Sequence, residues 1–421
     1  MDKYNKIIKK QLELIKTTKE EYEKIRGISD NFIKALKEKL KKNKIKADVF
    51  LGGSLAKGTI VKKDIYDIDI FVRFDKSYNK ANKNNEISNL LGKLLGKAKK
   101  VHGSRDYYQI KTKNILIEVI PVLKIEKPKQ SVNVTDLSYF HVNYIVKKIK
   151  KNPKLINEIV LAKTFAYAQN CYGAESYMQG FSGYSLELLI CHYKAFLNFV
   201  KEMSKINIKE KLIIDDKKLY KNNVLTEMNN SKTHSPIILV DPTFKERNAL
   251  SSLSKETFIK FQKSCKDFLR KPSKKFFIRK SVIENFKQKP IIISIKTNKQ
   301  SGDIAGTKSK KFFKFFFSRL KKEFEIKKSA FEYNDKKNLA NFYLVLNKKK
   351  PSLIRGPPIT SITNLNNFKK IHKNAFINNG FAYAKLKHNL TFNKWFKRFL
   401  KKDKKIIREM GVREVKKVNL N

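Results

Sequence analysis

The sequence predicts a multidomain α+β fold, and three observations lead to this prediction. The chain has 421 residues, which is enough for about two to four domains with cores of their own. Hydrophobic residues make up 41% of it, including 30 Phe and 17 Tyr, so a folded chain is expected. Segments that alternate apolar and polar residues lie toward both ends, and a long stretch with helical periodicity separates them.

The first domain is predicted over residues 1–138. Its first 45 residues carry Ile and Leu at helical spacing, which predicts one or two amphipathic helices. A short apolar strand at 47–53 enters a glycine turn, and an alternating strand follows at 66–74. A hairpin comes next, and its second strand is expected to end at Pro121. This order of elements predicts a small mixed α/β domain.

The rest of the chain divides by periodicity. Residues 139–285 are predominantly helical in pattern, although a strand and a proline turn interrupt them at 235–248. Residues 286–390 read strand, helix, strand, strand, which predicts a compact α/β unit that is RRM-like. Within it the loop 298–310 is the segment expected to be flexible. Residues 391–421 predict a basic helical region.

The charge balance is the most unusual property of the composition. The chain has 94 Lys and Arg against 38 Asp and Glu, for a formal net charge of +56. Such a chain repels itself unless it works beside a polyanion. A lysine-rich genome would raise the number of lysines, but it does not explain why acidic residues are so few. The composition therefore predicts a nucleic-acid partner.

Several classes of protein are excluded. The odd number of cysteines, with no CxxC pair, indicates neither a disulfide framework nor a zinc site and fits a reducing cytoplasm. The N-terminus is an amphipathic helix and not a signal peptide. No apolar run reaches the about 20 residues that span a bilayer, and the best candidate, residues 184–200, carries Glu187. We therefore expect a cytoplasmic protein that does not bind membranes.

The chemistry is concentrated in residues 50–74, "FLGGSLAKGTIVKKDIYDIDIFVRF". Asp67 and Asp69 lie two residues apart on a strand, so their side chains share one face. Two close carboxylates in apolar surroundings repel each other, and a divalent cation such as Mg²⁺ removes that cost. Glu118, the only charge in an apolar run, completes a site for two metal ions in nucleotidyl transfer if its strand is adjacent. The alternative is that the aspartates lie on the solvent side of a half-exposed strand.

The residues just before the aspartates are candidates for binding phosphate. Gly52, Gly53 and Ser54 predict a turn whose backbone N–H groups can face a triphosphate, with the Ser54 hydroxyl beside them. Lys57 adds a positive charge one turn later. The pattern therefore predicts a nucleoside triphosphate as substrate.

This pattern, Gly-Ser, then a basic residue, then [DE]-x-D on a strand, resembles the signature of the polymerase-β-like nucleotidyltransferase superfamily. The motif identifies the reaction and leaves the acceptor open. Three further segments are similar to the archaeal-type, class I CCA-adding enzymes, which are CCA tRNA nucleotidyltransferases: "YGAESYMQGFSGYSLELLICHY" (172–193), "LVDPTFKERNALSSLS" (239–254) and "RGPPI" (355–359). The resemblance extends over nearly the whole chain in the same order.

The resemblance implies a catalytic head over 1–138, a helical neck and body over 139–285, and an RNA-binding tail over 286–390. It also implies addition of C, C and A to the 3′ end of tRNA from CTP and ATP, with Mg²⁺ and no nucleic-acid template. Carried over by motif position, the metal ligands are Asp67, Asp69 and Glu118, and the triphosphate contacts are Ser54 and Lys57. The resemblance implies that the incoming nucleotide is contacted by His141, Lys163 and Tyr172. It implies that the base is sensed, and the shape of the site held, by Arg247 and Asn248. Glu118 stands where the family more often has Asp, and Lys57 where it often has Arg.

Taken without the resemblance, these residues have ordinary alternatives. Lys163 lies on an amphipathic helix and would pair with an Asp or Glu if not with a triphosphate. His141 could be a structural histidine, and Tyr172 a core aromatic residue. Arg247 has a planar fork that suits a base edge or a phosphate, but in isolation its segment predicts a solvated turn.

The expected partner is the acceptor stem and 3′ end of tRNA, together with CTP and ATP. Three basic stretches, 277–289, 307–322 and 396–408, would supply contacts to RNA phosphates, so binding should weaken with salt. A homodimer is left open. The alternative functions are a related nucleotidyltransferase that makes poly(A) or oligoadenylate products, and an inactive RNA-binding relative.

Overall fold

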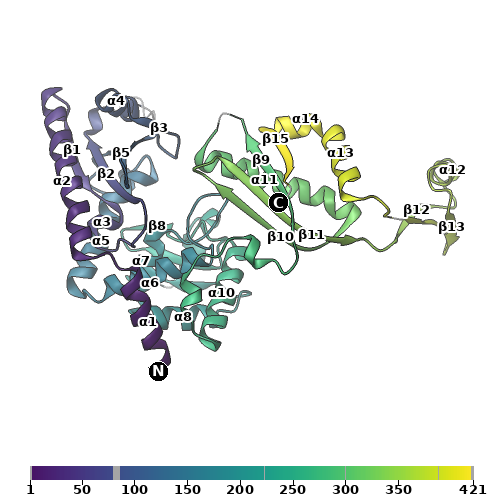
Figure 1. Ribbon diagram of the computed structural model, residues 1–421, viewed down its shortest axis with the longest axis horizontal. Helices are drawn as coiled ribbons and strands as arrows, with labels where there is room; N and C mark the ends of the chain where they lie inside the picture. Colours follow the sequence, from purple (N-terminus) through teal and green to yellow (C-terminus); the bar gives the residue numbers. More distant parts are fainter. Residues whose placement is uncertain (1, 79–85, 222, 299, 387, 419–421) are drawn as a thin grey trace. The chain divides into compact units, whose positions relative to one another are not determined.

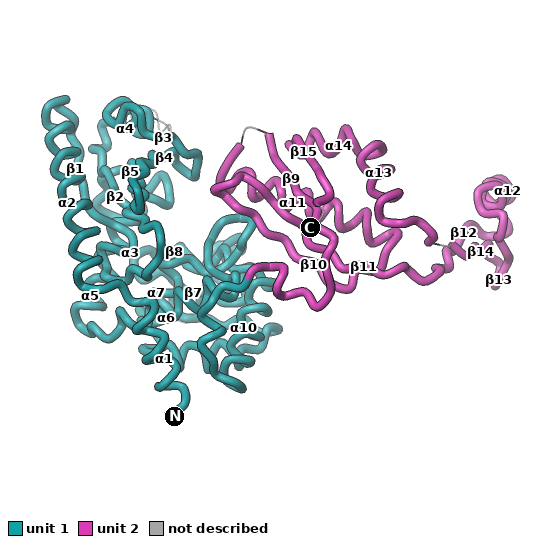
Figure 2. The backbone as a smooth tube through the Cα atoms, viewed as in Figure 1, with its two compact units in different colours: residues 1–280 teal, residues 281–421 magenta. Residues whose placement is uncertain are grey.

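The computed structural model of the chain divides into two compact units, residues 1–280 and residues 281–421 (Figure 1). Figure 2 colours the two units separately. The residues that the structure describes are 2–78, 86–221, 223–298, 300–386 and 388–418. Among them, no helix combines the length and the apolar character that crossing a membrane requires. The predicted multidomain α+β class is confirmed, while the boundary predicted at residue 138 stays a prediction.

A five-stranded sheet organises the first part of unit 1. Its strands are β1 (Ala47–Leu51), β2 (Tyr66–Phe74), β3 (Lys99–Val101), β4 (Tyr107–Lys111) and β5 (Ile115–Leu123). They lie in the order β1-β2-β5-β4-β3, in which only β2 and β5 are parallel. The helices of this part are α2 (Lys19–Lys42), α3 (Gly53–Ala56) and α4 (Glu86–Leu95).

The alternation of β2 explains its place in this sheet. Ile68, Ile70 and Val72 are fully buried and share one hydrophobic core with apolar side chains of α2 and α4. The residues between them are turned to the opposite face, where the aspartates lie. Helix α2 begins at a capping box in which Thr18 and Glu21 satisfy each other's backbone N–H groups.

The expectation that the last strand of the hairpin ends at Pro121 is wrong, because β5 continues to Leu123. The last residue of β5 that pairs with β4 is Val119, opposite Tyr108. Beyond it the strand pairs only with β2, where Pro121 lies opposite Val72. Proline is tolerated where a strand lacks a neighbour on one side, since no ladder hydrogen bond is lost there.

The second part of unit 1 is mainly helical, as predicted. Its helices are α1 (Asp2–Ile15), α5 (Ser138–Lys151), α6 (Leu155–Ala168), α7 (Gly183–Tyr193), α8 (Phe196–Lys205), α9 (Val224–Glu227) and α10 (Lys255–Arg270). A small sheet in the order β6-β7-β8 accompanies them, built from β6 (Leu212–Ile214), β7 (Ile237–Asp241) and β8 (Phe244–Asn248). Helices α6 and α7 are apolar on nearly every side and lie in the centre of the core.

Unit 2 contains a four-stranded antiparallel sheet with helices packed on one face. Its strands are β9 (Ile291–Thr297), β10 (Phe324–Asn334), β11 (Leu339–Lys348) and β15 (Val412–Val418), and its helices are α11 (Gly302–Glu323), α13 (Phe392–Lys402) and α14 (Lys404–Glu409). The strand order β10-β11-β9-β15 gives the β-α-β-β-α-β topology of ferredoxin-like and RRM domains.

The end of this domain differs from the one that the sequence pattern predicts. Residues 391–421 were expected to be a helical region of their own, but they supply α13, α14 and the strand β15. Strand β15 pairs with β9 and completes the sheet. Because a single seven-residue strand with two lysines and an arginine lacks a clear alternation, its pairing partner some 115 residues earlier decides its structure.

The expectation of a flexible loop over 298–310 is wrong for residues 302–310, which lie in α11, while residue 299 lies outside the described residues. The N–H of Gly302 donates to the Asp335 carboxylate at 3.0 Å, which anchors the first turn. Ala305 and Ser309 are fully buried against the sheet. The packing of these small residues and the hydrogen bond to the distant Asp335 outweigh the weak helix preference of the first turns of α11.

Residues 352–386 form a separate three-stranded sheet with one helix (Figure 2). Its elements are β12 (Ser352–Pro358), α12 (Ile362–Ile371), β13 (Ala375–Asn378) and β14 (Phe381–Leu386), and the order is β12-β14-β13. Short 3-10 turns complete the described structure: η1 (Lys76–Tyr78), η2 (Pro128–Gln130), η3 (Val134–Leu137), η4 (Asn230–Lys232), η5 (Lys274–Phe277) and η6 (Ile283–Asn285).

Candidate active site

The three predicted carboxylates lie on one face of the sheet in unit 1. Asp69 on β2 is directly opposite Glu118 on β5, and Asp67 lies two residues before Asp69 on the same face. All three are partly exposed between fully buried neighbours. The structure therefore brings together the residues that the sequence singled out.

The electrostatics of these carboxylates show that negative charge is crowded here. Burial and the nearby Asp67 raise the pKa of the Asp69 carboxyl. Burial and the charge of Asp69 raise the pKa of Glu118 to about 7. Two residues limit the repulsion: Lys63 forms an ion pair with Asp67, and the Gln109 amide donates to Glu118 at 2.8 Å.

The oxygen donors on this face fit a divalent cation, although they are not gathered around one point. Within the described residues, no set of three or more His, Cys, Asp or Glu side chains has the arrangement of a metal site. Asp67 is turned to Lys63 and Glu118 to Gln109. A hard cation that prefers carboxylate oxygens would remove the repulsion that raises both pKa values.

The glycine turn before β2 lies directly against these carboxylates. Gly53 has a φ of +59°, and a Cβ built on it would lie 1.8 Å from an Asp69 carboxylate oxygen. A Cβ on Gly52 would lie 2.2 Å from the Phe71 ring. The Gly52 N–H donates to the Asp69 carbonyl at 2.8 Å. Only glycine fits at either position, so the turn and Ser54 are held next to Asp69.

A buried charge cluster lies beside the turn. Glu187 of α7 is fully buried and accepts from Lys57 at 2.7 Å and from Lys163 of α6 at 2.8 Å. Lys163 also donates to the Thr59 hydroxyl at 3.0 Å. Burial acts to raise the pKa of Glu187, but the charges of Lys163 and Lys57 hold it below its usual value. Two lysines share one carboxylate, and burial, opposed by the charge of Glu187, lowers the pKa of Lys163.

Tyr172 lies at the edge of this cluster. It forms an isolated bridge with Phe181, and its hydroxyl lies 3.0 Å from the position of a Cβ on Gly183, the first residue of α7. Burial, followed by the charges of Glu187 and Asp69, raises the pKa of the Tyr172 hydroxyl. The phenol is therefore neutral and available to donate a hydrogen bond.

A second network is centred on Asp241 at the end of β7. This fully buried carboxylate lies 3.0 Å from His141 Nε2, accepts from Arg247 Nη1 at 2.7 Å and accepts from the Tyr184 hydroxyl at 3.0 Å. The N–H and hydroxyl of Thr243 donate to it at 2.8 Å and 2.7 Å. Burial would raise the pKa of Asp241, but the His141 contact and the Arg247 charge hold it well below its usual value.

The network sets the orientation of His141 and Arg247. The His141 ring stacks on Tyr184 with centroids 4.1 Å apart, and the Arg247 guanidinium lies 5.6 Å from the centre of the same ring. The Arg247 side chain remains 23% exposed. Its fork is thus fixed on one side by Asp241 and open on the other.

The Asn248 side chain makes its hydrogen bonds within the protein. It is 1% exposed, and its side-chain oxygen accepts from the N–H groups of Leu239 and Leu250. Its amide nitrogen donates to the Lys232 carbonyl and the Ser235 hydroxyl. These four bonds join β8 to β7 and to the segments beside them, an arrangement that suits the role of holding the shape of the site.

Two protein families match unit 1. The family described as "Nucleotidyltransferase domain" matches residues 30–165, and the family described as "tRNA nucleotidyltransferase, second domain" matches residues 157–278. The first match contains the three carboxylates, the glycine turn and His141, and the second contains Tyr184, Asp241 and Arg247.

Similar proteins extend this match to most of the chain. A CCA-adding enzyme of Methanocaldococcus jannaschii is 30% identical over 402 residues, which cover 91% of this chain and 88% of that protein. The chain belongs to the CCA-adding enzymes. A relative from Nanoarchaeum equitans is 43% identical over 242 residues, which cover 57% of this chain and 59% of that protein. With this relative and several others of the family, the match spans less than two thirds of their length.

The solved structures similar to this member of the family share its fold at low identity. One, the Cid1 RNA terminal uridylyl transferase, is 12% identical with a TM-score of 0.50, and the match covers 66% of this chain and 99% of that chain. At this identity the likeness shows the fold alone. Nucleotidyltransferases of this kind generally use divalent metal ions.

The sequence missed the two acidic residues that organise this CCA-adding enzyme's site. A signal for Glu187 was present, because it is the single acidic residue in an apolar helical run, as Glu118 is in its strand. A lone charge in a buried element needs a partner. Asp241 gave no comparable signal, since an Asp-Pro pair most often marks an ordinary turn.

Proposed function

We propose that this chain adds C, C and A to the 3′ end of tRNA from CTP and ATP, without a nucleic-acid template. The observation that carries the proposal is the face on which Asp69 and Glu118 stand opposite each other against a glycine turn, in a chain that belongs to the CCA-adding enzymes. The 3′-hydroxyl of the RNA attacks the α-phosphorus of the nucleotide. A new P–O bond forms as the bond to pyrophosphate breaks.

In this proposal Asp67, Asp69 and Glu118 hold Mg²⁺ at the reacting phosphate. The metal would lower the pKa of the attacking hydroxyl and stabilise the charge on the leaving pyrophosphate. The carboxylates themselves supply oxygen ligands from two adjacent strands, and Gly53 allows Asp69 to lie against the turn. To bind the cation, Asp67 would give up its contact with Lys63, and Glu118 its contact with Gln109.

The triphosphate is proposed to lie over the cluster of Lys57, Lys163 and Ser54. Lys57 and Lys163 share the Glu187 carboxylate, and a triphosphate would favour the charged form of both lysines. The Tyr172 hydroxyl supplies a neutral donor at the edge of the cluster. Because these groups are already fixed by hydrogen bonds, little side-chain entropy is lost when a triphosphate binds.

The base is proposed to lie against Arg247 and His141. Asp241 and Tyr184 hold both side chains in one arrangement, and the free side of the Arg247 guanidinium can donate two hydrogen bonds to a base edge. A fixed donor pair discriminates between bases because a base with the wrong edge leaves it unpaired.

Incubation of the protein with tRNA that lacks its terminal CCA, with Mg²⁺ and with labelled CTP and ATP tests the proposal. We expect two C residues and then one A, with no further extension. Long A tails, or products made without tRNA, would replace the proposal with a poly(A)-type or oligoadenylate-type enzyme. RNA binding without any incorporation would indicate an inactive relative.

Two finer points belong to this proposal as well. We propose a cytoplasmic location, which fits three buried cysteines that form no disulfide. A homodimer, which the sequence leaves open, is tested by the sedimentation of the full chain with and without tRNA.

A further inference from the structure

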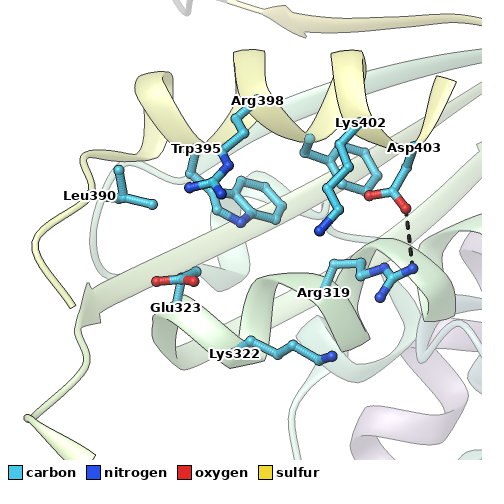
Figure 3. Close-up of a pocket in the computed structure, with 9 residues that line it drawn as sticks. Arg319, Lys322, Glu323, Leu390, Trp395, Arg398, Lys402 and Asp403 are labelled. Carbon is cyan, nitrogen blue, oxygen red and sulfur yellow. Dashed lines mark hydrogen bonds and ion pairs between the residues drawn. The ribbon is translucent and has the colours of Figure 1, made fainter. Parts of the chain in front are cut away.

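The structure assigns a second RNA contact to unit 2: we propose that a pocket between α11 and α13 binds a backbone phosphate of the tRNA. The pocket has a volume of about 180 Å³. Figure 3 shows that its cationic side chains come from both helices, with Arg319 and Lys322 on α11 and Arg398 and Lys402 on α13. The inference rests on the proposed function, because it takes the RNA substrate as its ligand.

The charge of the pocket is not balanced by its own acidic residues. Asp403 is committed to Arg319, whose guanidinium lies 3.1 Å from the carboxylate. Glu323 contacts His388 at 3.4 Å, and these two carboxylates face four cations in the pocket. Among the described residues, the side chains of Lys322, Arg398 and Lys402 have no hydrogen bond or ion pair.

The pair of Arg319 and Asp403 gives the pocket a fixed wall. The Asp403 side chain is only 8% exposed, and the Arg319 guanidinium lies 5.1 Å from the centre of the Phe315 ring. Lys349 donates to the carbonyls of Lys321 and Lys322 at the end of α11 and so fixes that turn. Three unpaired cations are therefore held around a defined space.

The size and the walls of the pocket indicate which anion it takes. Trp395 and Phe399 line the pocket but are 6% and 5% exposed, so they offer no face on which a base could stack. A volume of about 180 Å³ is smaller than the about 300 Å³ at which small-molecule sites begin. A single phosphate group with its water satisfies both limits, whereas a nucleoside triphosphate does not.

An RNA phosphate is favoured over a free one because further cations of the same two helices surround the residues that line the pocket. The helices that build it belong to two of the basic stretches noted in the sequence, 307–322 and 396–408. The structure brings cations of both stretches to one pocket although 76 residues separate Lys322 from Arg398 in the sequence. A polyanion gains affinity at such a point by releasing counterions, which a free phosphate does not.

The test compares full-length variants in their binding to tRNA that lacks its CCA, over a series of salt concentrations. The double variant Arg398→Gln with Lys402→Gln should weaken binding by about 5- to 10-fold and lower the slope of log Kd against log salt by about one to two. The single-charge control is Lys397→Gln, which removes a cation of α13 that does not line the pocket and should change Kd by less than about twofold.

A second variant keeps the charges and exchanges the residues, Arg398→Lys with Lys402→Arg, and it should retain the salt slope. Thermal unfolding midpoints of all variants show whether they fold. An unchanged slope in the folded double Gln variant would overturn the proposal. A second result would also overturn it: inorganic phosphate raises the unfolding midpoint of the unsubstituted protein but not of the double Gln variant, while both proteins bind tRNA equally. The pocket would then bind a small anion and not RNA.

Failure of this inference can be told apart from failure of the proposed function. If the unsubstituted protein incorporates CTP and ATP but the double Gln variant binds tRNA with the same slope, only the pocket is wrong. If the unsubstituted protein neither binds nor extends tRNA, the proposed function is wrong and the pocket loses its ligand.

Discussion

The cations of the two units differ in how they are held. In unit 1, Lys57 and Lys163 are 9% and 8% exposed and share the fully buried Glu187. In unit 2, Lys322, Arg398 and Lys402 stand around an open pocket without such partners. Buried pairs fix the geometry of a site but destabilise the fold when they are broken. Exposed cations contribute little to the fold and attract a polyanion in a manner that salt can screen.

The largest effect should come from the carboxylates of unit 1. Asp69→Asn removes the charge at the centre of the face and keeps its shape, so nucleotide incorporation should fall by about a thousandfold or more. Steady-state incorporation of labelled CMP into tRNA measures it. The control is Asp48→Asn on β1, which breaks an exposed ion pair with Lys124 and should retain activity. A loss of less than about tenfold in Asp69→Asn would contradict the metal-binding role.

The next effect is on folding. Glu187→Gln leaves Lys57 and Lys163 buried side by side without their carboxylate, which should lower the free energy of unfolding by about 3 kcal/mol. Denaturant titration measures it, and Glu202→Gln in an exposed pair with Lys205 should cost less than about 0.5 kcal/mol.

The same variant tests where the triphosphate binds. CTP with Mg²⁺ would supply the missing negative charge, so it should raise the unfolding midpoint more in Glu187→Gln than in the unsubstituted protein. An equal or smaller rise would place the triphosphate away from the two lysines.

The Asp241 network should show a smaller effect with a distinct pH dependence. Asp241→Asn removes the charge that holds Arg247 and His141, at a cost of about 2 kcal/mol near neutral pH. The folded-state pKa of Asp241 lies below the unfolded value of about 3.9, so this stabilisation is complete above about pH 5 and is lost only as the pH falls below about 4. The half-exposed pair of His192 and Asp216 is the control, and Asp216→Asn should cost less.

Salt concentration should distinguish the buried lysines of unit 1 from the exposed cations of unit 2. An increase in salt from about 50 to about 200 mM should raise the KM for tRNA by about tenfold or more. The KM for CTP should change by less than about threefold, because ion pairs buried as Lys163 and Glu187 are screened little. A parallel rise of both constants would mean that the buried lysines bind their ligand no differently from the surface ones.

Local pattern was sufficient where a residue's neighbours in the chain determine its surroundings. The alternation of β2 put Asp67 and Asp69 on one face, and Gly52 and Gly53 marked the turn that touches them. Local pattern was insufficient where a residue far along the chain determines whether a helix or strand forms. Gly302 needs Asp335 to begin α11, and β15 needs β9 to become a strand at all.

The sequence by itself determined the chemistry of this protein: a strand with two aspartates, a glycine turn, a lone glutamate and a large excess of cations indicate transfer of a nucleotide beside a polyanion. Only the tertiary structure decided which charges are paired. Glu187 meets Lys57, 130 residues away, Asp241 meets His141, and Asp403 meets Arg319. The physical reason is that periodicity records which face of an element is buried, whereas the strength of a charge depends on what packs against that face.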